Sequence, residues 1–469
     1  SSHFGASLEA RLHFAIKLVV LTHAMTTSDL QDGMQELESG QEKDYNACHQ
    51  ADVGTVVVKV STPSKKCCSC RCCCACCLIF VIVLIILAFV LRIVVLNYFT
   101  GVGMNSFLLL NTTQTRAYMG AGLTMSNITY NIFWPGCGTV SSMTDFSSGC
   151  GDLCYSAELM EDMQAFNAQH PGLLVSFPSR SQSGVEPVNL TAWWLPAAPS
   201  GSGHLPPRIV LQHGFKSNSN FYREMLASYM LRSLGFSVLV NNFRDHGYSD
   251  ESSQEIDQWA DSYVYDVLGA WDYAVNDPDG LLGGSLPSAL VGAMGFSKGA
   301  MVIAAAFGLE GNVPAAWLDA PPFRPETVFS HRARRIISEM GFGFLADSLV
   351  PTVWANMEEE AKSRGVDLNR YLPENTLPQG PETQRPVHVT GNTDDRTVPN
   401  IGDNSQIDKF LQLMGAHKSK YNVSSHLSAG SCNGEAHCAD HLRDFEAYRS
   451  RLCVFWKSAF HLDGFQCPP

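Results

Sequence analysis

The sequence has little positive charge. Its 469 residues contain 32 Lys and Arg against 45 Asp and Glu, and the formal net charge is −13 at pH 7. Binding the phosphate backbone of a nucleic acid depends on clustered positive charge. The composition therefore argues against a nucleic-acid partner, and we expect none. The acidity by itself favours no particular substrate.

Histidine is absent from the densest cluster of cysteines, which occupies residues 67–77. A zinc finger needs a second ligand pair at a fixed separation, commonly with histidine, and this cluster has neither. Cysteines directly before a membrane span are typical S-palmitoylation sites, because each lies close enough to the bilayer to be acylated. We therefore prefer palmitoylation to a metal cluster and expect no metal site. The candidate acylation sites are Cys67, Cys68, Cys70, Cys72, Cys73, Cys74, Cys76 and Cys77.

Charge is also nearly absent from residues 78–96, where Arg92 is the one ionisable side chain. About 20 apolar residues at roughly 1.5 Å each cross a bilayer core, so this run predicts a transmembrane helix over residues 78–98. Basic residues crowd positions 59–71, while the next one after the span is Arg116. The positive-inside rule then predicts a single-pass protein whose N-terminus is cytoplasmic and whose larger part is lumenal or extracellular, with the span as signal-anchor.

Two features of the sequence after the span agree with this orientation. Four N-glycosylation sequons and seven further cysteines all follow the span, and in an oxidising lumen these cysteines would form up to three disulfides. Their pairing cannot be read from the sequence. The sequons begin at Asn111, Asn127, Asn189 and Asn422, and the cysteines are Cys137, Cys150, Cys154, Cys432, Cys438, Cys453 and Cys467.

Composition and periodicity divide the chain into five regions, without internal repeats. We expect a disordered cytoplasmic tail at 1–66, the Cys-rich juxtamembrane segment at 67–77 and the transmembrane helix at 78–98. A lumenal connecting region follows at 99–170, and a globular domain occupies 171–469.

Short apolar runs alternate with amphipathic stretches from residue 171 onward. This alternation is typical of βαβ units, so the predicted fold class is α/β, with a mostly parallel central sheet flanked by helices. Residues 324–380 interrupt the alternation with additional helical sequence, which predicts a helical cap inserted into the domain. The expected strands are 173–177, 188–195, 208–212, 237–241, 289–295, 315–319, 386–390 and 420–425, and helices are expected near 155–169, 219–234, 256–275, 298–309, 404–415 and 440–460.

The strongest local motif is G-x-S-x-G at Gly295–Gly299, centred on Ser297. It follows an apolar strand and precedes a helix of small residues, which is the context of a nucleophile elbow. The backbone bends so sharply there that the flanking positions must be small, which explains Gly295 and Gly299. We therefore expect Ser297 to be the nucleophile of an acyl-transfer reaction.

An elbow predicts an oxyanion hole formed by a loop upstream of the nucleophile. His213-Gly214-Phe215 follows the strand at 208–212 and leads into a helix. The backbone amides of Phe215 and Lys298 are the expected donors to the tetrahedral oxyanion.

The sequence RPVHVTGNTDDRTVPN (residues 385–400) makes the resemblance to the α/β-hydrolase superfamily specific, because members commonly carry G-x-x-D-x-x-V-P after the corresponding strand. The resemblance implies that the catalytic acid lies here. Spacing from Gly391 selects Asp394, whereas the Val-Pro turn selects Asp395, and we prefer Asp395. Asp319, at the end of another strand, is a rival that we interpret as structural.

The catalytic histidine is expected after the last strand and before the final helix. His437 lies there, and His441 is a near rival that falls where the helix should already have begun. His437 would accept the proton of Ser297 while Asp395 orients the imidazole. Cys432 and Cys438 bracket this loop, and a disulfide between them could hold His437 in place.

Residues 242–249 are similar to the superfamily's D-x-R-G-x-G-x-S turn, but Asn242 replaces Asp and Asp245 replaces Gly. The turn is structural in relatives, so His246 is given no chemical role. The resemblance spans about residues 171–460 and is greatest to the serine-aminopeptidase-like or monoacylglycerol-lipase-like branch.

The resemblance implies a membrane-tethered serine hydrolase that cleaves an ester, thioester or lipid acyl bond through an acyl-enzyme, without a cofactor. Its expected partners are a small-molecule or lipid acyl substrate and the membrane, and no protein partner is indicated. A serine peptidase, an acyltransferase or a non-catalytic receptor on the same fold remain as alternatives.

Overall fold

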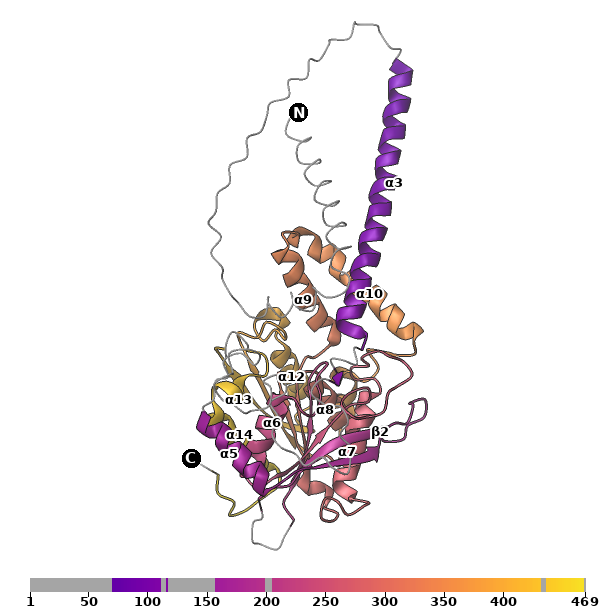
Figure 1. The fold of residues 1–469 in the computed structure, drawn as a ribbon. Coiled ribbons are helices and arrows are strands. Elements are labelled where there is room, and N and C mark those ends of the chain that lie inside the picture. Colours follow the sequence, from indigo (N-terminus) through magenta and orange to yellow (C-terminus); the bar gives the residue numbers. More distant parts are fainter. Residues whose placement is uncertain (1–69, 111–114, 117–156, 199–204, 432–435, 468–469) are drawn as a thin grey trace. The chain divides into compact units, whose positions relative to one another are not determined.

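The computed structural model describes residues 70–110, 115–116, 157–198, 205–431 and 436–467 (Figure 1). The chain divides into two compact units, Ser1–Val81 and Ile82–Pro469, and the second contains the whole sheet. The tail predicted at residues 1–66 lies outside the described residues, as does most of the connecting region predicted at 99–170.

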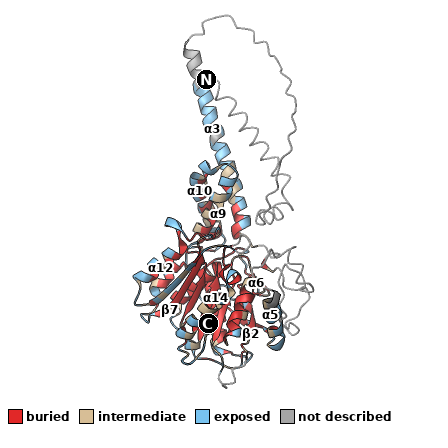
Figure 2. Cartoon of the chain, turned by 90° about the vertical axis from the view of Figure 1, so that its left-hand side faces the viewer, coloured by how far each residue is buried: buried red, intermediate tan, exposed pale blue. Residues whose placement is uncertain are grey.

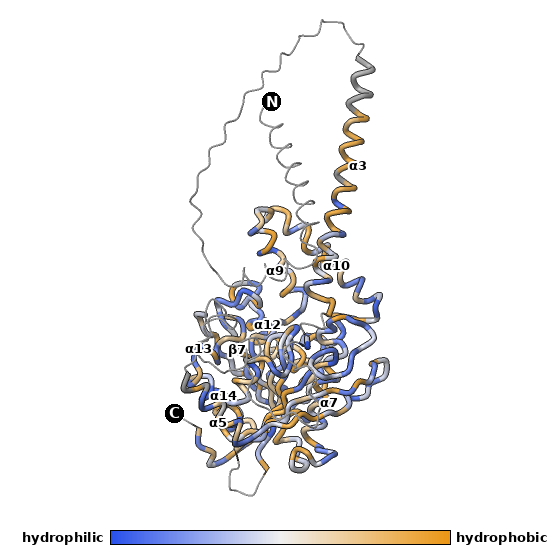
Figure 3. The backbone as a smooth tube through the Cα atoms, viewed as in Figure 1, coloured by the Kyte–Doolittle hydropathy of each residue, from blue (hydrophilic) through white to orange (hydrophobic). Residues whose placement is uncertain are grey.

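A long apolar helix, α3, covers Cys70–Gly103. The stretch Leu78–Leu108 is long and apolar enough to cross a membrane. Its side chains are largely exposed up to residue 94 (Figure 2), and Figure 3 shows their hydrophobic character. The helix runs beyond its predicted end at residue 98 because Leu96 and Phe99 pack against the core of the domain. A π-helix, η1 (Met104–Leu108), follows directly.

The domain is built on an eight-stranded sheet with the order β1-β2-β4-β3-β5-β6-β7-β8. β2 is antiparallel to both of its neighbours, and every neighbouring pair from β4 to β8 is parallel. All eight predicted strands are confirmed, with small differences at their ends. The strands are β1 (Leu173–Pro178), β2 (Asn189–Leu195), β3 (Arg208–Gln212), β4 (Ser237–Asn241), β5 (Val291–Phe296), β6 (Ala316–Asp319), β7 (Arg385–Asn392) and β8 (Tyr421–Ser428).

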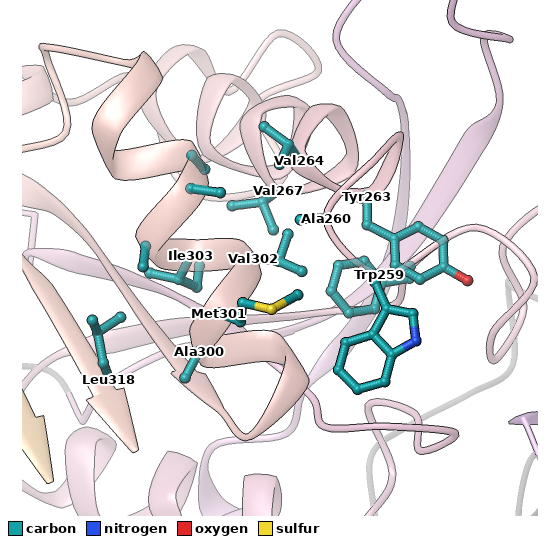
Figure 4. Close-up of a cluster of buried hydrophobic side chains, with 14 of the residues drawn as sticks. Trp259, Ala260, Tyr263, Val264, Val267, Ala300, Met301, Val302, Ile303 and Leu318 are labelled. Carbon is teal, nitrogen blue, oxygen red and sulfur yellow. The ribbon is translucent and has the colours of Figure 1, made fainter. Parts of the chain in front are cut away.

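Helices cover both faces of the sheet, because successive strand residues are buried on opposite faces. On one face α8 packs against α7, and Figure 4 shows Met301 and Val302 of α8 in the same buried cluster as Val264 and Val267 of α7. The opposite face carries α6 and α14, with Met225 and Trp456 in a separate buried cluster. The helices are α5 (Ala157–Gln169), α6 (Tyr222–Ser233), α7 (Tyr263–Asn276), α8 (Lys298–Leu309), α12 (Gln406–Ala416), α13 (Asp440–Arg443) and α14 (Phe445–Ala459), with short 3-10 turns η3 (Ser288–Leu290) and η5 (Gly402–Asn404).

Additional helices lie between β6 and β7, in the region where the sequence predicts a cap. They are α9 (Pro325–Glu339), α10 (Gly343–Ser363), α11 (Pro373–Thr376) and the 3-10 turn η4 (Leu377–Gln379). α9 and α10 pack against each other. Phe329 and Trp354, one from each helix, join the same buried cluster as α7 and α8.

The helix predicted near 256–275 begins later, at Tyr263. Residues 256–262 are irregular instead, with Ile256 in an isolated antiparallel bridge to Leu109. Trp259 has a positive φ of 49°, and its amide donates to Asp257 Oδ1 at 3.1 Å. A side-chain acceptor two residues before the amide competes with the helical hydrogen bond, which explains the late start.

Candidate active site

Ser297 lies on a sharp turn between β5 and α8, with φ 51° and ψ −122°. A Cβ on Gly299 would lie 2.4 Å from the carbonyl oxygen of His213, and a Cβ on Gly295 would lie 2.6 Å from the backbone of Gly299. Only glycine permits these approaches, so the elbow geometry explains both flanking residues. A mostly parallel sheet that presents a serine on such a turn is the α/β-hydrolase arrangement expected from the sequence.

The structure brings Ser297, His437 and Asp395 together in one hydrogen-bonded chain. His437 Nε2 lies 2.7 Å from Ser297 Oγ, and His437 Nδ1 lies 2.7 Å from Asp395 Oδ2. The other oxygen of Asp395 accepts from the amides of Thr397 and Val398 at 2.8 and 2.9 Å. The Val-Pro turn therefore fixes the carboxylate in the orientation that faces the histidine.

Asp394, the alternative acid, points elsewhere. Its Oδ2 accepts from the amide of Gly430 at 2.7 Å, and the residue is exposed. Its contact is therefore with the loop after β8, and Asp395 is the carboxylate that contacts the imidazole of His437.

Asp319 and His441, the alternative candidates for the catalytic acid and histidine, are both buried and contact structural residues. Tyr448 Oη donates to Asp319 Oδ2 at 2.6 Å, and burial, together with the nearby charge of Asp440, raises the pKa of Asp319 to about 7. His441 lies between the rings of Phe296 and Tyr448, and burial lowers its pKa to about 3. Asp319 supports the elbow through its backbone, because its carbonyl accepts from the amide of Ser297 at 2.8 Å.

The two residues expected to form the oxyanion hole lie beside Ser297. A Cβ on Gly214 would be 3.5 Å from Ser297 Cβ, so the loop that carries Phe215 runs along the elbow. Lys298 is the first residue of α8, where backbone amides have no acceptor within the helix. The positions suit two donors to a developing anion, and that role stays a prediction.

A buried ion pair next to the elbow was not predicted. Lys298 Nζ lies 2.7 Å from Asp257 Oδ2, and both side chains are fully buried. The ammonium also lies 4.7 Å from the ring centroid of Tyr263 and 5.1 Å from that of Phe243. Burial lowers the pKa of Lys298, while Asp257 opposes this shift. No sequence pattern relates Lys298 to Asp257, because only the fold brings the two together.

The turn at residues 242–249 has the structural role that the sequence indicates. Arg244 forms a fully buried ion pair with Asp266 at 2.7 Å, and the side chain of Asn242 accepts from the amide of Ser219 at 2.8 Å. His246 is fully buried with Nδ1 2.8 Å from the carbonyl of Arg244, and burial lowers its pKa well below the ordinary value.

The cysteines correct one expectation. Cys438 is a buried free thiol, so the predicted disulfide between Cys432 and Cys438 is wrong. The thiol is enclosed next to His437, with Sγ 3.8 Å from the carbonyl of Asp319. A disulfide joins Cys453 to Cys467 at the C-terminal end of the domain.

The remaining candidate modification sites are partly described. Asn189 and Asn422 are exposed on strands, whereas Asn111 and Asn127 lie outside the described residues, as do Cys67 and Cys68. The cysteines from 70 to 77 belong to α3. Within the described ranges, no group of three or more His, Cys, Asp or Glu side chains could hold a metal ion.

No family model and no curated protein matches the sequence. Solved structures do resemble it. An esterase of Pyrococcus furiosus is 17% identical, with 64% of this chain and 94% of that chain covered and a TM-score of 0.43. A puromycin-hydrolyzing peptidase of Mycobacterium tuberculosis is 21% identical over 63% of this chain and 40% of that chain, with a TM-score of 0.42. An acylaminoacyl peptidase is 15% identical over 61% and 41%, also with a TM-score of 0.42. The fold assignment rests on the strand order and the elbow, not on these likenesses.

Proposed function

We propose that this protein is a membrane-tethered serine hydrolase that cleaves an ester, thioester or lipid acyl bond. The observation that carries the proposal is the hydrogen-bonded chain from Ser297 through His437 to Asp395, with both steps at 2.7 Å. A nucleophile, a base and an orienting carboxylate in this order are the parts that covalent acyl transfer requires.

The geometry supports a reaction in two halves. His437 Nε2 accepts the proton of Ser297 Oγ as this oxygen attacks the acyl carbon, and the oxyanion forms beside the amides of Phe215 and Lys298. The imidazolium then gives the proton to the leaving alcohol or thiol, which departs and leaves an acyl-enzyme. In the second half, His437 accepts a proton from water as the water attacks the acyl-enzyme. It then returns this proton to Ser297 Oγ, and the carboxylic acid is released. Asp395 keeps the proton on Nδ1 and stabilises the imidazolium.

Two features support an amphiphilic substrate. The apolar helix α3 would keep the site near a bilayer, in a lumenal or extracellular position. The end of α9, the turn after it and the start of α10 expose four large apolar side chains, which would favour contact with lipid over water. These are Ile336, Met340, Phe344 and Leu345. Palmitoylation of the juxtamembrane cysteines and glycosylation of the sequons belong to the same proposal.

Labelling of the full chain in detergent with a fluorophosphonate tests the proposal, because this probe reacts with an activated serine. The wild type should be labelled, while Ser297→Ala and His437→Ala should not, and esters of graded acyl length can then be compared. His461→Ala, which changes an exposed histidine, is the matched control and should label as the wild type does. A folded wild-type protein that resists the probe would contradict the proposal and favour a binding protein.

A further inference from the structure

We propose that the junction segment (residues 104–110), which connects α3 to the domain, positions the two amides expected to stabilise the oxyanion, with Phe107 and Lys216 as positioning residues. The inference rests on the proposed function, because an oxyanion forms only if Ser297 attacks an acyl group. It gives the end of the membrane helix a part in catalysis that a simple tether would not have.

Phe107 forms the first link. Its ring is buried and lies 5.4 Å from the ring of Phe215, the residue that carries one of the expected donor amides. Trp259 completes the stack, at 5.0 Å from Phe107 and 5.4 Å from Phe215. The ring of Phe329, from the cap helix α9, contacts Phe107 edge-on with the ring centroids 5.5 Å apart. The aromatic side chain of Phe215 is therefore held by the junction segment.

Lys216 forms the second link. Its Nζ donates to the backbone carbonyls of Asn105 and Ser106 at 3.4 and 3.1 Å. The residue is buried and has a positive φ of 49°, a backbone conformation that residues other than glycine seldom adopt. Since Lys216 directly follows Phe215, its hold on the junction segment also sets the path of the loop that carries the donor amide.

The third link reaches Lys298. The amide of Asp257 donates to the carbonyl of Leu108 at 2.7 Å, and the amide of Leu110 donates to the backbone carbonyl of Glu255 at 3.3 Å. Asp257 in turn holds the side chain of Lys298 at 2.7 Å. The ammonium of Lys298 lies 5.6 Å from the ring centroid of Phe215, so the two donor residues also contact each other.

These links matter for the transition state in particular. Amides that stabilise a developing oxyanion work because they are fixed before the charge appears, and a small displacement weakens them. The loop that carries Phe215 is held on one side by the amide of Gly214, which donates to Glu224 Oε1 of α6 at 3.2 Å. On the other side it is held by the contacts of the Phe215 and Lys216 side chains with the junction segment. A looser junction should therefore lower kcat and leave KM almost unchanged, because the substrate's ground state has no oxyanion to bind.

The charge of Lys216 adds a pH signature. Burial lowers the pKa of this ammonium to about 8, with Asp257 opposing the shift and Lys298 and Arg332 of α9 adding to it. As pH rises through about 8, Lys216 loses its charge and donates more weakly to the junction carbonyls. The wild-type kcat should fall over this range. An arginine stays charged there, so Lys216→Arg should lack this fall.

The test is steady-state hydrolysis of a short, water-soluble ester by the full chain in detergent. Lys216→Met and Phe107→Ala should each lower kcat by about tenfold, with KM within about twofold of the wild type. This loss of kcat is smaller than the roughly 10²- to 10³-fold loss that follows removal of a whole oxyanion donor. Lys216→Arg should restore kcat at neutral pH, and Phe107→Leu should be intermediate. Lys418→Met, at an exposed position, is the matched control.

The outcomes separate this inference from the proposed function. A folded wild type that neither labels nor turns over refutes the proposed function. Wild-type turnover with kcat unchanged in Lys216→Met and Phe107→Ala refutes only the positioning role, as does a rise in KM without a change in kcat. If these variants do not fold, the comparison of wild type with Lys216→Arg decides: an identical alkaline fall in both overturns the inference.

Discussion

Two adjacent carboxylates, Asp394 and Asp395, are candidates for the acid that contacts His437, and their hydrogen bonds distinguish them. Asp395 contacts His437 at 2.7 Å, whereas Asp394 contacts the amide of Gly430. Asp395→Asn should lower kcat on the order of 10⁴-fold, because an amide cannot hold the imidazole in the required tautomer. Asp394→Asn conserves the same shape one residue away and should change kcat by less than about threefold. Ester hydrolysis by both variants measures this, and a reversed order would assign the acid to Asp394.

Asp319 should make stability depend on pH. Its pKa is raised from 3.8 to about 7, chiefly by burial. Between these values the folded protein keeps a proton that the unfolded chain has released, so stability falls as pH rises from about 4 to 7 and then levels off. Asp319→Asn removes this dependence. The melting temperature of the variant relative to wild type should therefore increase across that window.

Thermal unfolding of the full chain at pH 4.5 and pH 8 checks this expectation. Asn keeps an oxygen that can accept from Tyr448, so the contact at 2.6 Å is retained in the variant. Asp463→Asn, on the exposed surface, should melt like wild type at both values. An offset for Asp319→Asn that is the same at both pH values would contradict the assigned shift.

At the level of single residues, local sequence predicted contacts that a motif specifies and missed those that only the fold creates. Ser297, Asp395 and His437 each lie in a recognisable position relative to a strand. Asp257 and Lys216 carry no such signal, because Asp257 meets Lys298, and Lys216 meets Asn105, only after distant parts of the chain have packed together. The proposed disulfide at Cys438 failed for a related reason, since proximity in sequence does not orient two thiols.

At the level of elements, Gly299 lets the start of α8 pack directly against the end of β3. A methyl group at Gly299 would meet the carbonyls of His213 and Gln212 at 2.4 and 2.6 Å. Gly299→Ala should separate α8 from β3, with loss of stability and of fluorophosphonate labelling. Gly415→Ala is the control: a Cβ added at this position in α12 would meet no atom within 4 Å outside its own helix, and alanine should stabilise the helix by up to about 1 kcal/mol. Equal melting temperatures for the two variants would contradict this account.

The ends of helices and strands are harder to predict than their presence. The strands follow from their apolar runs, and all eight are present. The start of α7 depends on the side chain of Asp257, which binds the amide of Trp259, and the end of α3 depends on the packing of Phe99. Both are set by tertiary contacts that periodicity does not report.

At the scale of the whole molecule, the cap helix α10 contacts the C-terminal end of the apolar helix α3. Asn356 of α10 donates to Thr100 of α3 at 3.3 Å, and a Cβ on Gly103 would meet Met357 at 2.5 Å. The sequence predicted the cap as an interruption of the α/β alternation but not this contact, because α3 and α10 are far apart in the chain. A membrane that holds α3 would therefore lie close to the cap.

The exposed apolar side chains of the cap should then matter for membrane-borne substrates alone. Phe344 is 73% exposed and Leu345 is 40% exposed. Transfer of such side chains out of water gains about 1.5–3 kcal/mol each, so replacing both by serine should lower hydrolysis of a long-chain ester in vesicles by roughly tenfold or more. Hydrolysis of a short soluble ester and the melting temperature should not change, because neither side chain is in the core. Val454→Ser, at a side chain 58% exposed on α14, is the control. Equal loss on both substrates would show that the cap turn acts on the catalytic site itself rather than on access from the membrane.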